Sequence, residues 1–312
     1  MKCLVLGGRG FIGSHLVDAL IGEGHFVRCF DRPHVISLGE AHLSSPKFEL
    51  YEGDLTSDAD VSAALAGCDV CFHLVSTTLP KSSNLDPVFD VESNVLGTVR
   101  LLMHAVRLRV RKVIFVSSGG TVYGVPEQLP IPETHSTDPF CSYGISKLAI
   151  EKYLGLFRKL HGLDCAVLRL ANPYGERQRT LASQGVIAVF LGKILRDEPV
   201  EIWGDGSVVR DYIYIDDVVE ALILALRSNK GEYVFNIGAG CGKSLNEVLD
   251  VIERVTGRSA ARCYLPARSF DVPVSVLDIS RARRVLNWSP KVSFDEGLAR
   301  FANWLQKNPH HG

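Results

Sequence analysis

A tyrosine and a lysine four residues apart, Tyr143 and Lys147, stand at the head of a helical pattern. Residues with this spacing lie on one face of a helix, so the phenol and the ammonium can approach each other. A free tyrosine titrates near pH ~10 and needs a stabilised phenolate to carry protons at neutral pH. A neighbouring ammonium gives that stabilisation. The pair is therefore a candidate acid/base centre.

The strand that precedes this helix ends in hydroxyl side chains. The apolar run Val113–Val116 is followed by Ser118 and, three residues later, by Thr121. A hydroxyl at the end of that strand would complete a proton path between the tyrosine and a substrate oxygen. Tyr-Lys pairs with this spacing also occur on ordinary exposed helices, so the chemical interpretation depends on what the rest of the chain provides.

A glycine-rich turn near the N-terminus provides the necessary context. The strand pattern Lys2–Leu6 meets Gly7, Gly10 and Gly13, and an amphipathic helix continues to Gly22. Strand, glycine turn and helix together form the fingerprint of a dinucleotide-binding unit. The glycines allow a tight turn and close approach to a pyrophosphate, and the helix N-terminus offers unpaired amides to the phosphates.

The second strand indicates which dinucleotide binds. It runs over residues 25–30 and ends in Asp31. A carboxylate at this position accepts hydrogen bonds from the adenosine ribose and repels a 2′-phosphate, so Asp31 favours NAD over NADP. The adjacent Arg32 could instead bind that phosphate or stack on adenine, which leaves NADP as the alternative.

Strand and helix patterns alternate along the first half of the chain. This alternation predicts a parallel sheet with right-handed crossovers and helices on both faces, a doubly wound, Rossmann-type α/β fold. Ligands in such folds bind at the carboxyl ends of the strands. The further residues assigned to the cofactor site on this basis are Phe11, Ile12, Asp54, Leu55, Leu74 and Asn94.

The organisation of the chain changes near residue 175. Residues 1–175 are expected to form the NAD-binding domain with the Tyr-Lys pair. Residues 176–312 are expected to form mainly a smaller α/β lobe that binds substrate, with some segments returning to the sheet. Within the first part we expect strands over 48–53, 70–74, 113–116 and 164–170, and one long helix over 87–108.

Composition narrows the class of protein. The chain has 312 residues, 46% of them hydrophobic and 22% charged, with a net charge of -1. This balance gives no reason to expect nucleic acid or a membrane as partner. No signal peptide is recognised at the N-terminus, so a cytoplasmic location is expected, and the eight scattered cysteines are expected to be reduced, with no metal site.

Longer motifs resemble the extended short-chain dehydrogenase/reductase family, in particular its NAD-dependent nucleotide-sugar epimerases and dehydratases. The resemblance covers essentially the whole chain and is highly specific for the family, less so for the reaction. The segments that carry it are GGRGFIG (7–13), GDL (53–55), SSGGTVYG (117–124), YGISK (143–147), LRLANPYG (168–175), WGDG (203–206), RDYIYIDDV (210–218) and RSFD (268–271).

The resemblance implies roles for individual residues. Tyr143 and Lys147 match the acid/base and its electrostatic partner, and Asn172 matches an asparagine that contacts the nucleotide diphosphate. The residues matching the phosphate-binding arginines and their neighbours at the substrate site are Arg210, Arg268, Asp271 and Ser275. Cations at a dianionic pyrophosphate make chemical sense.

The sequence departs from the family pattern at Gly119, where relatives place the catalytic serine or threonine. Either Ser118 or Thr121 must then supply the hydroxyl, and we favour Ser118. Dehydratases of the family carry an acidic pair just before Val-Tyr-Gly, because elimination of water needs additional acid and base groups. Glycine and threonine in those places favour 4-epimerisation of a UDP-hexose, by transient oxidation at C4.

The resemblance also addresses the sugar and the assembly. A small residue such as Ser275 at the place beside the hexose implies that UDP-GlcNAc and UDP-GalNAc are accepted, with UDP-Glc and UDP-Gal as further candidates. The family implies a homodimer through the helices over 87–108 and 143–160, and Leu101, Leu102, Leu154 and Phe157 could serve either this interface or the core. The alternative functions are a 4,6-dehydratase, a UDP-glucuronate 4-epimerase, a ketosugar reductase and a non-catalytic NAD-binding protein.

Overall fold

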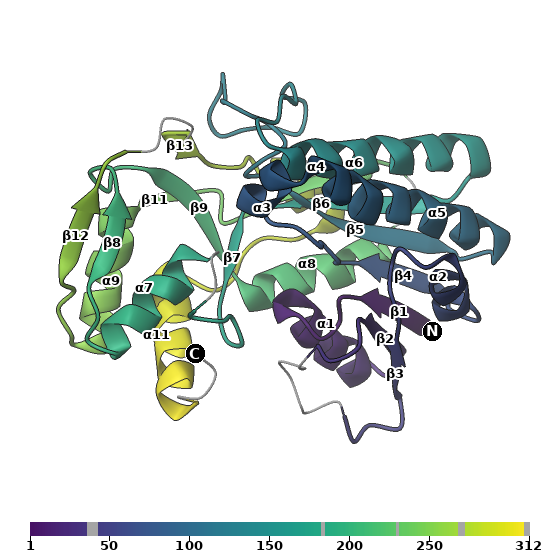
Figure 1. Cartoon of the computed structure of the whole chain (residues 1–312), viewed down its shortest axis with the longest axis horizontal. Coiled ribbons are helices and arrows are strands. Elements are labelled where there is room, and N and C mark those ends of the chain that lie inside the picture. Colours follow the sequence, from purple (N-terminus) through teal and green to yellow (C-terminus); the bar gives the residue numbers. More distant parts are fainter. Residues whose placement is uncertain (36–42, 182–184, 229–230, 268–271, 309–312) are drawn as a thin grey trace.

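A parallel sheet of seven strands organises the computed structural model, in the order β10-β6-β5-β4-β1-β2-β3 (Figure 1). The structure describes residues 1–35, 43–181, 185–228, 231–267 and 272–308. The direction of winding reverses between β1 and β4, which creates the crevice where such folds bind ligands. The strands are β1 (Lys2–Leu6), β2 (Phe26–Asp31), β3 (Phe48–Glu52), β4 (Val70–His73), β5 (Lys112–Ser118), β6 (Asp164–Leu170) and β10 (Val234–Ile237).

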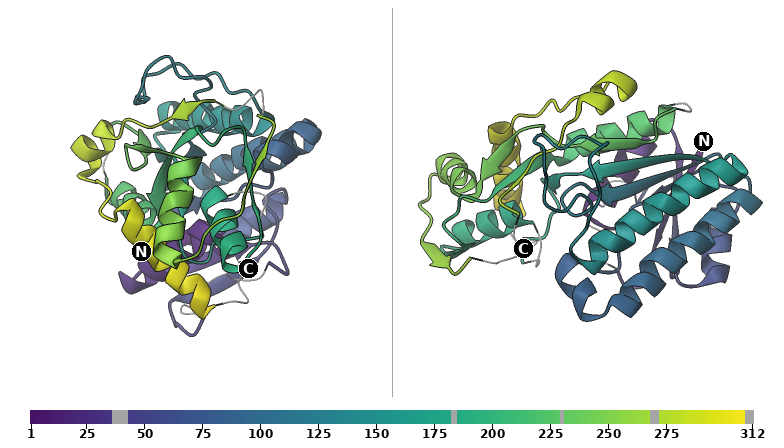
Figure 2. Two further views of the ribbon diagram at one scale, coloured as in Figure 1. Left: turned by 90° about the vertical axis from the view of Figure 1, so that its left-hand side faces the viewer. Right: turned by 90° about the horizontal axis from the view of Figure 1, so that it is seen from above.

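Helices cover both faces of this sheet, as Figures 1 and 2 show. Alternation of side chains along β1 divides the core accordingly: Cys3 and Val5 belong to one buried cluster, and Leu4 and Leu6 to the other. The doubly wound fold predicted from the sequence is confirmed. One face carries α1 (Phe11–Gly22) and α8 (Ile215–Arg227), and the other carries α2 (Asp58–Leu65), α5 (Gly97–Arg107) and α6 (Ser142–His161).

The C-terminal half builds a smaller lobe and also returns two elements, β10 and α8, to the large sheet. In the lobe, β9 pairs with β11, β13 and β7, while β8 and β12 form a separate two-stranded sheet. The elements are β7 (Asn172–Tyr174), α7 (Val186–Leu195), β8 (Val200–Trp203), β9 (Val209–Tyr214), β11 (Gly242–Ser244), α9 (Leu245–Thr256), β12 (Arg262–Leu265), β13 (Val274–Ser275), α10 (Ser280–Leu286) and α11 (Phe294–Lys307).

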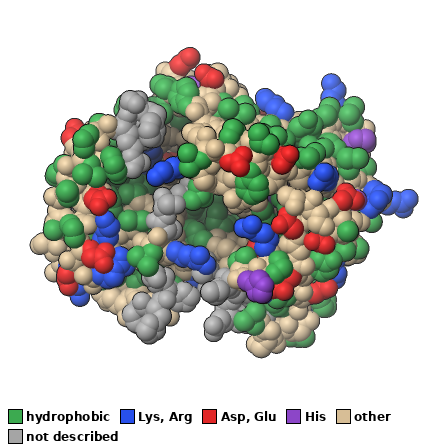
Figure 3. Space-filling view, in the orientation of Figure 1, with side chains coloured by type: hydrophobic (Ala, Val, Ile, Leu, Met, Phe, Trp, Pro, Cys, Tyr) green, Lys and Arg blue, Asp and Glu red, His purple; other side chains and the backbone are tan. Residues whose placement is uncertain are grey.

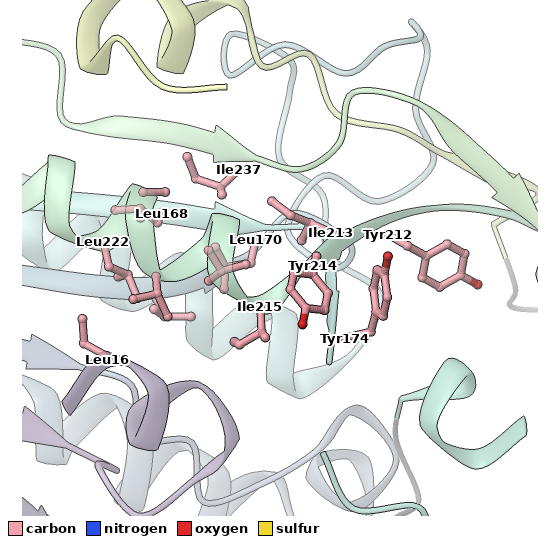
Figure 4. Close-up of a cluster of buried hydrophobic side chains, with 14 of the residues drawn as sticks. Leu16, Leu168, Leu170, Tyr174, Tyr212, Ile213, Tyr214, Ile215, Leu222 and Ile237 are labelled. Atoms are coloured by element: carbon pink, nitrogen blue, oxygen red, sulfur yellow. The ribbon is translucent and has the colours of Figure 1, made fainter. Parts of the chain in front are cut away.

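One buried apolar cluster extends from the sheet into the lobe, from Leu168 and Leu170 of β6 to Tyr174 and Tyr214 (Figure 4). Tyr174 of β7 packs edge-on against Tyr214 of β9, with ring centroids 5.7 Å apart, and its other neighbour is Phe294 at 5.6 Å. Edge-to-face pairs at such separations are favourable beyond the apolar area that they bury. The rings therefore hold β7, β9 and α11 together where the lobe meets the carboxyl end of β6, since a single residue separates β6 from β7.

The long helix predicted over 87–108 is confirmed as one continuous helical segment over 87–107, but it is not regular α-helix throughout. The segment consists of α4 (Pro87–Asp90), a π-helical turn (Val91–Leu96) and α5, and a short helix α3 (Pro80–Leu85) precedes it. The amide of Asn94, inside the π-turn, donates to the Asp90 carbonyl at 3.1 Å and to its carboxylate at 3.0 Å. Such turns are frequent where helices carry functional side chains.

The cysteines are free thiols throughout the described chain. Five of them (Cys3, Cys29, Cys68, Cys71 and Cys165) are buried, Cys141 is partly buried, and Cys241 and Cys263 are exposed. In the described ranges, no three His, Cys, Asp or Glu side chains gather as a metal site. None of the helices that the structure describes has the length and apolar character needed to span a membrane.

Candidate active site

The glycine turn forms a close-packed cradle at the end of β1. Gly7 has φ +80°, which favours glycine, and a Cβ on Gly13 would lie 2.1 Å from the Gly7 carbonyl oxygen and 2.7 Å from the Cα of Gly8. Helix α1 starts with Gly10 as its N-cap, and none of the described side chains caps it. The first amides of α1, which include those of Phe11 and Ile12, are therefore available to an anion, as a pyrophosphate requires.

Asp31 lies at the carboxyl end of β2, next to this cradle. Its carboxylate accepts the backbone N–H of Arg9 at 3.1 Å and that of Arg32 at 3.0 Å. Burial raises the pKa of Asp31, and the two backbone donors and the nearby arginine charges oppose that rise. The Arg9 guanidinium pairs with Glu52 at 2.9 Å. The carboxylate is thus held where the predicted ribose contact needs it.

The remaining predicted cofactor residues, Leu74, Leu55, Asp54 and Asn94, differ in burial and in hydrogen-bond partners. The Leu74 amide donates to the Leu6 carbonyl at 3.1 Å, which places Leu74 at the end of β4. Leu55 is buried under α5, and the partly exposed Asp54 carboxylate accepts the Thr56 amide and hydroxyl. Asn94 is buried, and its amide is used by the loop after β4: its oxygen accepts the Thr77 N–H at 3.0 Å.

Tyr143 and Lys147 lie side by side on α6, above the end of β5. The Lys147 Nζ lies 5.5 Å from the centroid of the Tyr143 ring and 4.7 Å from that of Phe115. It donates a hydrogen bond of 3.0 Å to the Val116 carbonyl oxygen. The predicted pair therefore comes together with the ammonium fixed to the sheet, where it faces the phenol.

Burial moves the pKa values of the two groups in opposite directions. It raises the pKa of the Tyr143 phenol to about 12; the charges of Cys141 and Asp90 raise it further, and a hydrogen bond with Ser76 lowers it. Burial lowers the pKa of the Lys147 ammonium to about 8, although nearby carboxylates raise it. At neutral pH the pair holds a protonated phenol beside an ammonium, so proton transfer needs further stabilisation of the phenolate.

The structure explains the glycine at position 119. A Cβ there would lie 2.6 Å from Leu277 Cδ1 and 3.2 Å from the Leu170 carbonyl oxygen. Leu277 thus fills the space of the missing side chain. Ser118, one residue earlier, is partly exposed, whereas the Thr121 hydroxyl is enclosed and has no hydrogen-bond partner among the described residues.

The predicted substrate residues come from three adjacent strands of the lobe. Asn172 of β7 donates to the Asp211 carbonyl at 2.9 Å, and the Arg210 guanidinium donates to the Val272 carbonyl at 2.6 Å. Ser275 of β13 stands directly across from Arg210 in the β13–β9 pairing. The surface is hollowed between the lobe and the sheet, with basic side chains near the hollow (Figure 3). The remaining two predicted residues, Arg268 and Asp271, lie outside the described residues.

Sequence reasoning missed the residues that hold the start of α6. Ser83 Oγ accepts the Tyr143 N–H at 3.0 Å, and the Asn84 amide oxygen accepts the Ser142 N–H at 2.9 Å. Ser76, in the loop after β4, hydrogen-bonds to the Tyr143 side chain. These residues precede Tyr143 by 59 positions or more, and no local spacing in the sequence links them to it.

The glycine cradle and the Tyr-Lys pair at the carboxyl edge of a parallel sheet define a dinucleotide-dependent enzyme of the short-chain dehydrogenase/reductase type. A model of the NAD dependent epimerase/dehydratase family matches residues 3–238. The chain belongs to this family, and NAD is its cofactor. The residues of the cradle fit that cofactor, since they combine open helix amides with a carboxylate at the ribose position. The resemblance found in the sequence is confirmed.

Relatives extend over nearly the whole chain. A UDP-glucose 4-epimerase of Mycolicibacterium smegmatis is 41% identical over 313 residues, 98% of this chain and 99% of the relative. The crystal structure of the Thermotoga maritima UDP-glucose 4-epimerase with UDP-glucose superposes with a TM-score of 0.93 at 38% identity, covering 99% and 100% of the two chains. A UDP-N-acetylglucosamine 4-epimerase from Methanobrevibacter ruminantium M1, in complex with UDP-N-acetylmuramic acid, has a TM-score of 0.91 at 30% identity and 98% coverage of both chains.

Replacing Gly13 by alanine tests the cradle. The added methyl group would overlap the Gly7 carbonyl, so the turn must open, and we expect NAD affinity to fall roughly tenfold or more. Gly22→Ala is the matched control, because it lies in the same helix and its Cβ would meet nothing within 4 Å. Calorimetric titration of cofactor-free protein with NAD measures both variants. Equal affinities would refute the assignment of this turn.

Proposed function

We propose that this protein interconverts the C4 epimers of a UDP-hexose. The observation that carries the proposal is the Tyr143-Lys147 pair, held at the sheet edge opposite the strands that present Asn172 and Arg210. Tyr143 accepts the proton of the sugar C4 hydroxyl as that carbon is oxidised to a ketone, and returns a proton when it is reduced. NAD, held by the glycine turn and Asp31, would supply the acceptor and donor of the C4 hydride. No net oxidation results.

Lys147 lowers the cost of forming the phenolate. Burial alone makes that anion unfavourable, as the pKa of about 12 for Tyr143 indicates. The Lys147 ammonium is fixed by the Val116 carbonyl beside the ring, so it stabilises the phenolate without having to reorganise. Its pKa of about 8 keeps it mostly charged at pH 7. The charge is therefore present when the proton moves.

Ser118 is the hydroxyl that we assign to the substrate. A group that hydrogen-bonds to a sugar oxygen must be reachable from the crevice, and Ser118 is partly exposed at the end of β5. The Thr121 hydroxyl is enclosed and has no hydrogen-bond partner among the described residues, so it is less available to a substrate than Ser118. Gly144, at the start of α6, packs directly on the segment around Thr121: its Cβ would lie 2.9 Å from the Thr121 carbonyl oxygen.

Purified protein incubated with UDP-GlcNAc, and separately with UDP-Glc, tests the activity. We expect the C4 epimer to appear in proton NMR spectra without net change of NAD. Tyr143→Phe removes the proton acceptor and should lower kcat by about 10²- to 10⁴-fold. Tyr153→Phe is the control, because that tyrosine lies on the same helix but is exposed. Products lacking water, net cofactor oxidation, or no conversion with NAD supplied would instead favour a dehydratase, a reductase or a non-catalytic protein.

We further propose that N-acetylhexosamines are accepted. Ser275 is small and partly buried, and it stands beside Arg210 in the strand pairing. A small side chain next to the sugar leaves room for an acetamido group. Relatives that act on UDP-glucose and on UDP-N-acetylglucosamine share this fold, so the size of such a residue is a reasonable basis for selection.

Ser275→Tyr tests this assignment. The phenol would fill the space for the acetamido group, so kcat/KM for UDP-GlcNAc should fall roughly tenfold or more, a loss that a steric clash readily causes. The value for UDP-Glc serves as the internal control and should change much less. An equal loss with both sugars would show that Ser275 does not select between them.

A homodimer is the assembly that we propose. The residues named from the sequence, including Leu101 and Leu154, are buried in the core of the single chain and are unavailable to a partner. Helices α5 and α6 lie next to each other (Figure 2). Exposed apolar side chains follow one face of α6 and the adjoining part of α5 with the turn before it. Contiguous apolar surface of this kind marks interaction sites. Its members are Leu96, Met103, Ile145, Tyr153, Leu156 and Leu160.

Leu160→Asp would place a charge in this face, where Leu160 is 65% exposed. We expect the dimer to dissociate, because an unpaired charge in an interface is costly. Val285→Asp, on exposed α10, controls for the charge itself. Light scattering coupled to size-exclusion chromatography gives the mass of each variant. A dimer that persists in Leu160→Asp, or a wild-type monomer, would contradict the proposal.

A further inference from the structure

A buried carboxylate lies beneath the start of α6. Asp90 is fully buried and accepts four hydrogen bonds. Its Oδ1 accepts the Thr78 hydroxyl and, at 3.0 Å, the Asn94 amide. Its Oδ2 accepts the hydroxyls of Ser142 at 2.8 Å and Ser146 at 2.6 Å. Four donors match the acceptor capacity of a carboxylate anion.

The two serines bound by Oδ2 have the same spacing as the acid/base pair. Ser142 directly precedes Tyr143, and Ser146 directly precedes Lys147. Residues four apart lie one above the other on a helix. One oxygen that binds two hydroxyls one turn apart therefore fixes the rotation of α6 about its axis.

We propose that Asp90 is a positioning residue for the epimerase reaction: it sets the rotation of α6 that aims the phenol and the ammonium at the crevice. This inference rests on the proposed function. Asp90 touches neither sugar nor cofactor in this role and acts through Ser142 and Ser146. A small displacement of the phenol or the ammonium lowers the rate of proton transfer, because the reacting groups must be within hydrogen-bond distance.

Removing the Asp90 carboxylate should change the orientation of α6 but not detach the helix. Helix α6 is also held by Ser83 and Asn84, which accept backbone amides at its first turn and do not depend on Asp90. Loss of the carboxylate should therefore leave the helix attached, while its rotation becomes less restricted. Burying a carboxylate anion also costs free energy, because hydrogen-bond donors must replace the water that solvated its charge.

The charge of Asp90 acts on both members of the pair. For Tyr143, burial raises the pKa most, and the neighbouring charges of Cys141 and Asp90 also raise it. The Lys147 ammonium stands over the ring of the same tyrosine. Removing the Asp90 charge should therefore lower the pKa of the phenol.

The ammonium responds in the same direction. The carboxylates that face Lys147 are Glu151, one turn further along α6, and Asp90, and both raise its pKa against the effect of burial. Burial, together with the nearby Lys147 ammonium, lowers the pKa of the His73 imidazole on β4 to about 3. His73 therefore stays neutral. Without the Asp90 charge, both limbs of the pH profile should move to lower pH.

Asp90→Asn tests the proposal, because it keeps the shape of the side chain and removes the charge. We expect kcat to fall roughly tenfold, because the acid/base pair is less well oriented, while KM and the amount of bound NAD change little. We expect both limbs of the kcat profile to move down by roughly half a pH unit. Asp86→Asn is the matched control: Asp86 caps α4 by accepting the Phe89 N–H at 2.9 Å, but it is exposed.

A second readout does not need the epimerase activity. NMR of the NAD-bound protein carrying ¹³Cζ-labelled tyrosine, assigned with Tyr143→Phe, follows the phenol directly. The Tyr143 midpoint should lie lower in Asp90→Asn than in the wild type and in Asp86→Asn. An unchanged midpoint and an unchanged kcat overturn the proposal. If the wild type converts no UDP-sugar, the proposed function fails, while the midpoint still tests the action of Asp90.

The double variant Ser142→Ala/Ser146→Ala separates the effect of helix orientation from the effect of the Asp90 charge. It also provides a test if Asp90→Asn does not fold. It retains the Asp90 carboxylate but removes the two hydroxyls through which that carboxylate binds α6. We expect kcat to fall with KM and bound NAD preserved. Wild-type kcat in this variant would overturn the positioning role.

Discussion

The hydrogen bond from Lys147 Nζ to the Val116 carbonyl is the contact on which this site depends. It joins α6, which carries the proposed acid/base pair Tyr143 and Lys147, to β5, whose end carries the Ser117 and Ser118 hydroxyls. The ammonium is buried, so water screens its charge poorly, and it lies 5.5 Å from the centroid of the Tyr143 ring. The same burial brings the pKa of Lys147 down to about 8, which makes the charge sensitive to every carboxylate around it.

Buried polar groups continue from this contact into the core. Glu151, one turn after Lys147, forms an ion pair with Arg169 of β6 at 2.6 Å and accepts the Ser117 hydroxyl at 2.5 Å. The Arg169 guanidinium stacks over the ring of Tyr123, 4.8 Å from its centroid. Each charge has a partner, as buried charges require. The sheet edge is thereby tied to α6 through polar contacts, where apolar packing alone would leave more freedom.

The parts of the site that sequence reasoning predicted are those with local signatures. The strand before Gly7, the glycine spacing and the carboxylate at Asp31 follow one another along the chain, so their geometry is fixed by short-range rules. The helical segment over 87–107 was predicted, but its π-turn was not, because the turn depends on contacts of Asn94 with Asp90 and with the loop after β4. The sequence left open whether Leu101, Leu102, Leu154 and Phe157 serve the core or a partner, because an amphipathic pattern does not say whether its apolar face meets the sheet or a second copy. In the structure all four are buried in the core of the chain.

The sequence by itself determined the doubly wound fold, the cofactor and the Tyr143-Lys147 pair, because periodicity and i, i+4 spacing fix which side chains share a face. Only the tertiary structure decided why position 119 is glycine, since Leu277 reaches it from 158 residues away. It also decided that Asp90 lies beneath the acid/base helix, 52 and 56 residues from the serines it holds. Contacts over such distances depend on how elements pack, and packing leaves no periodic trace in the chain.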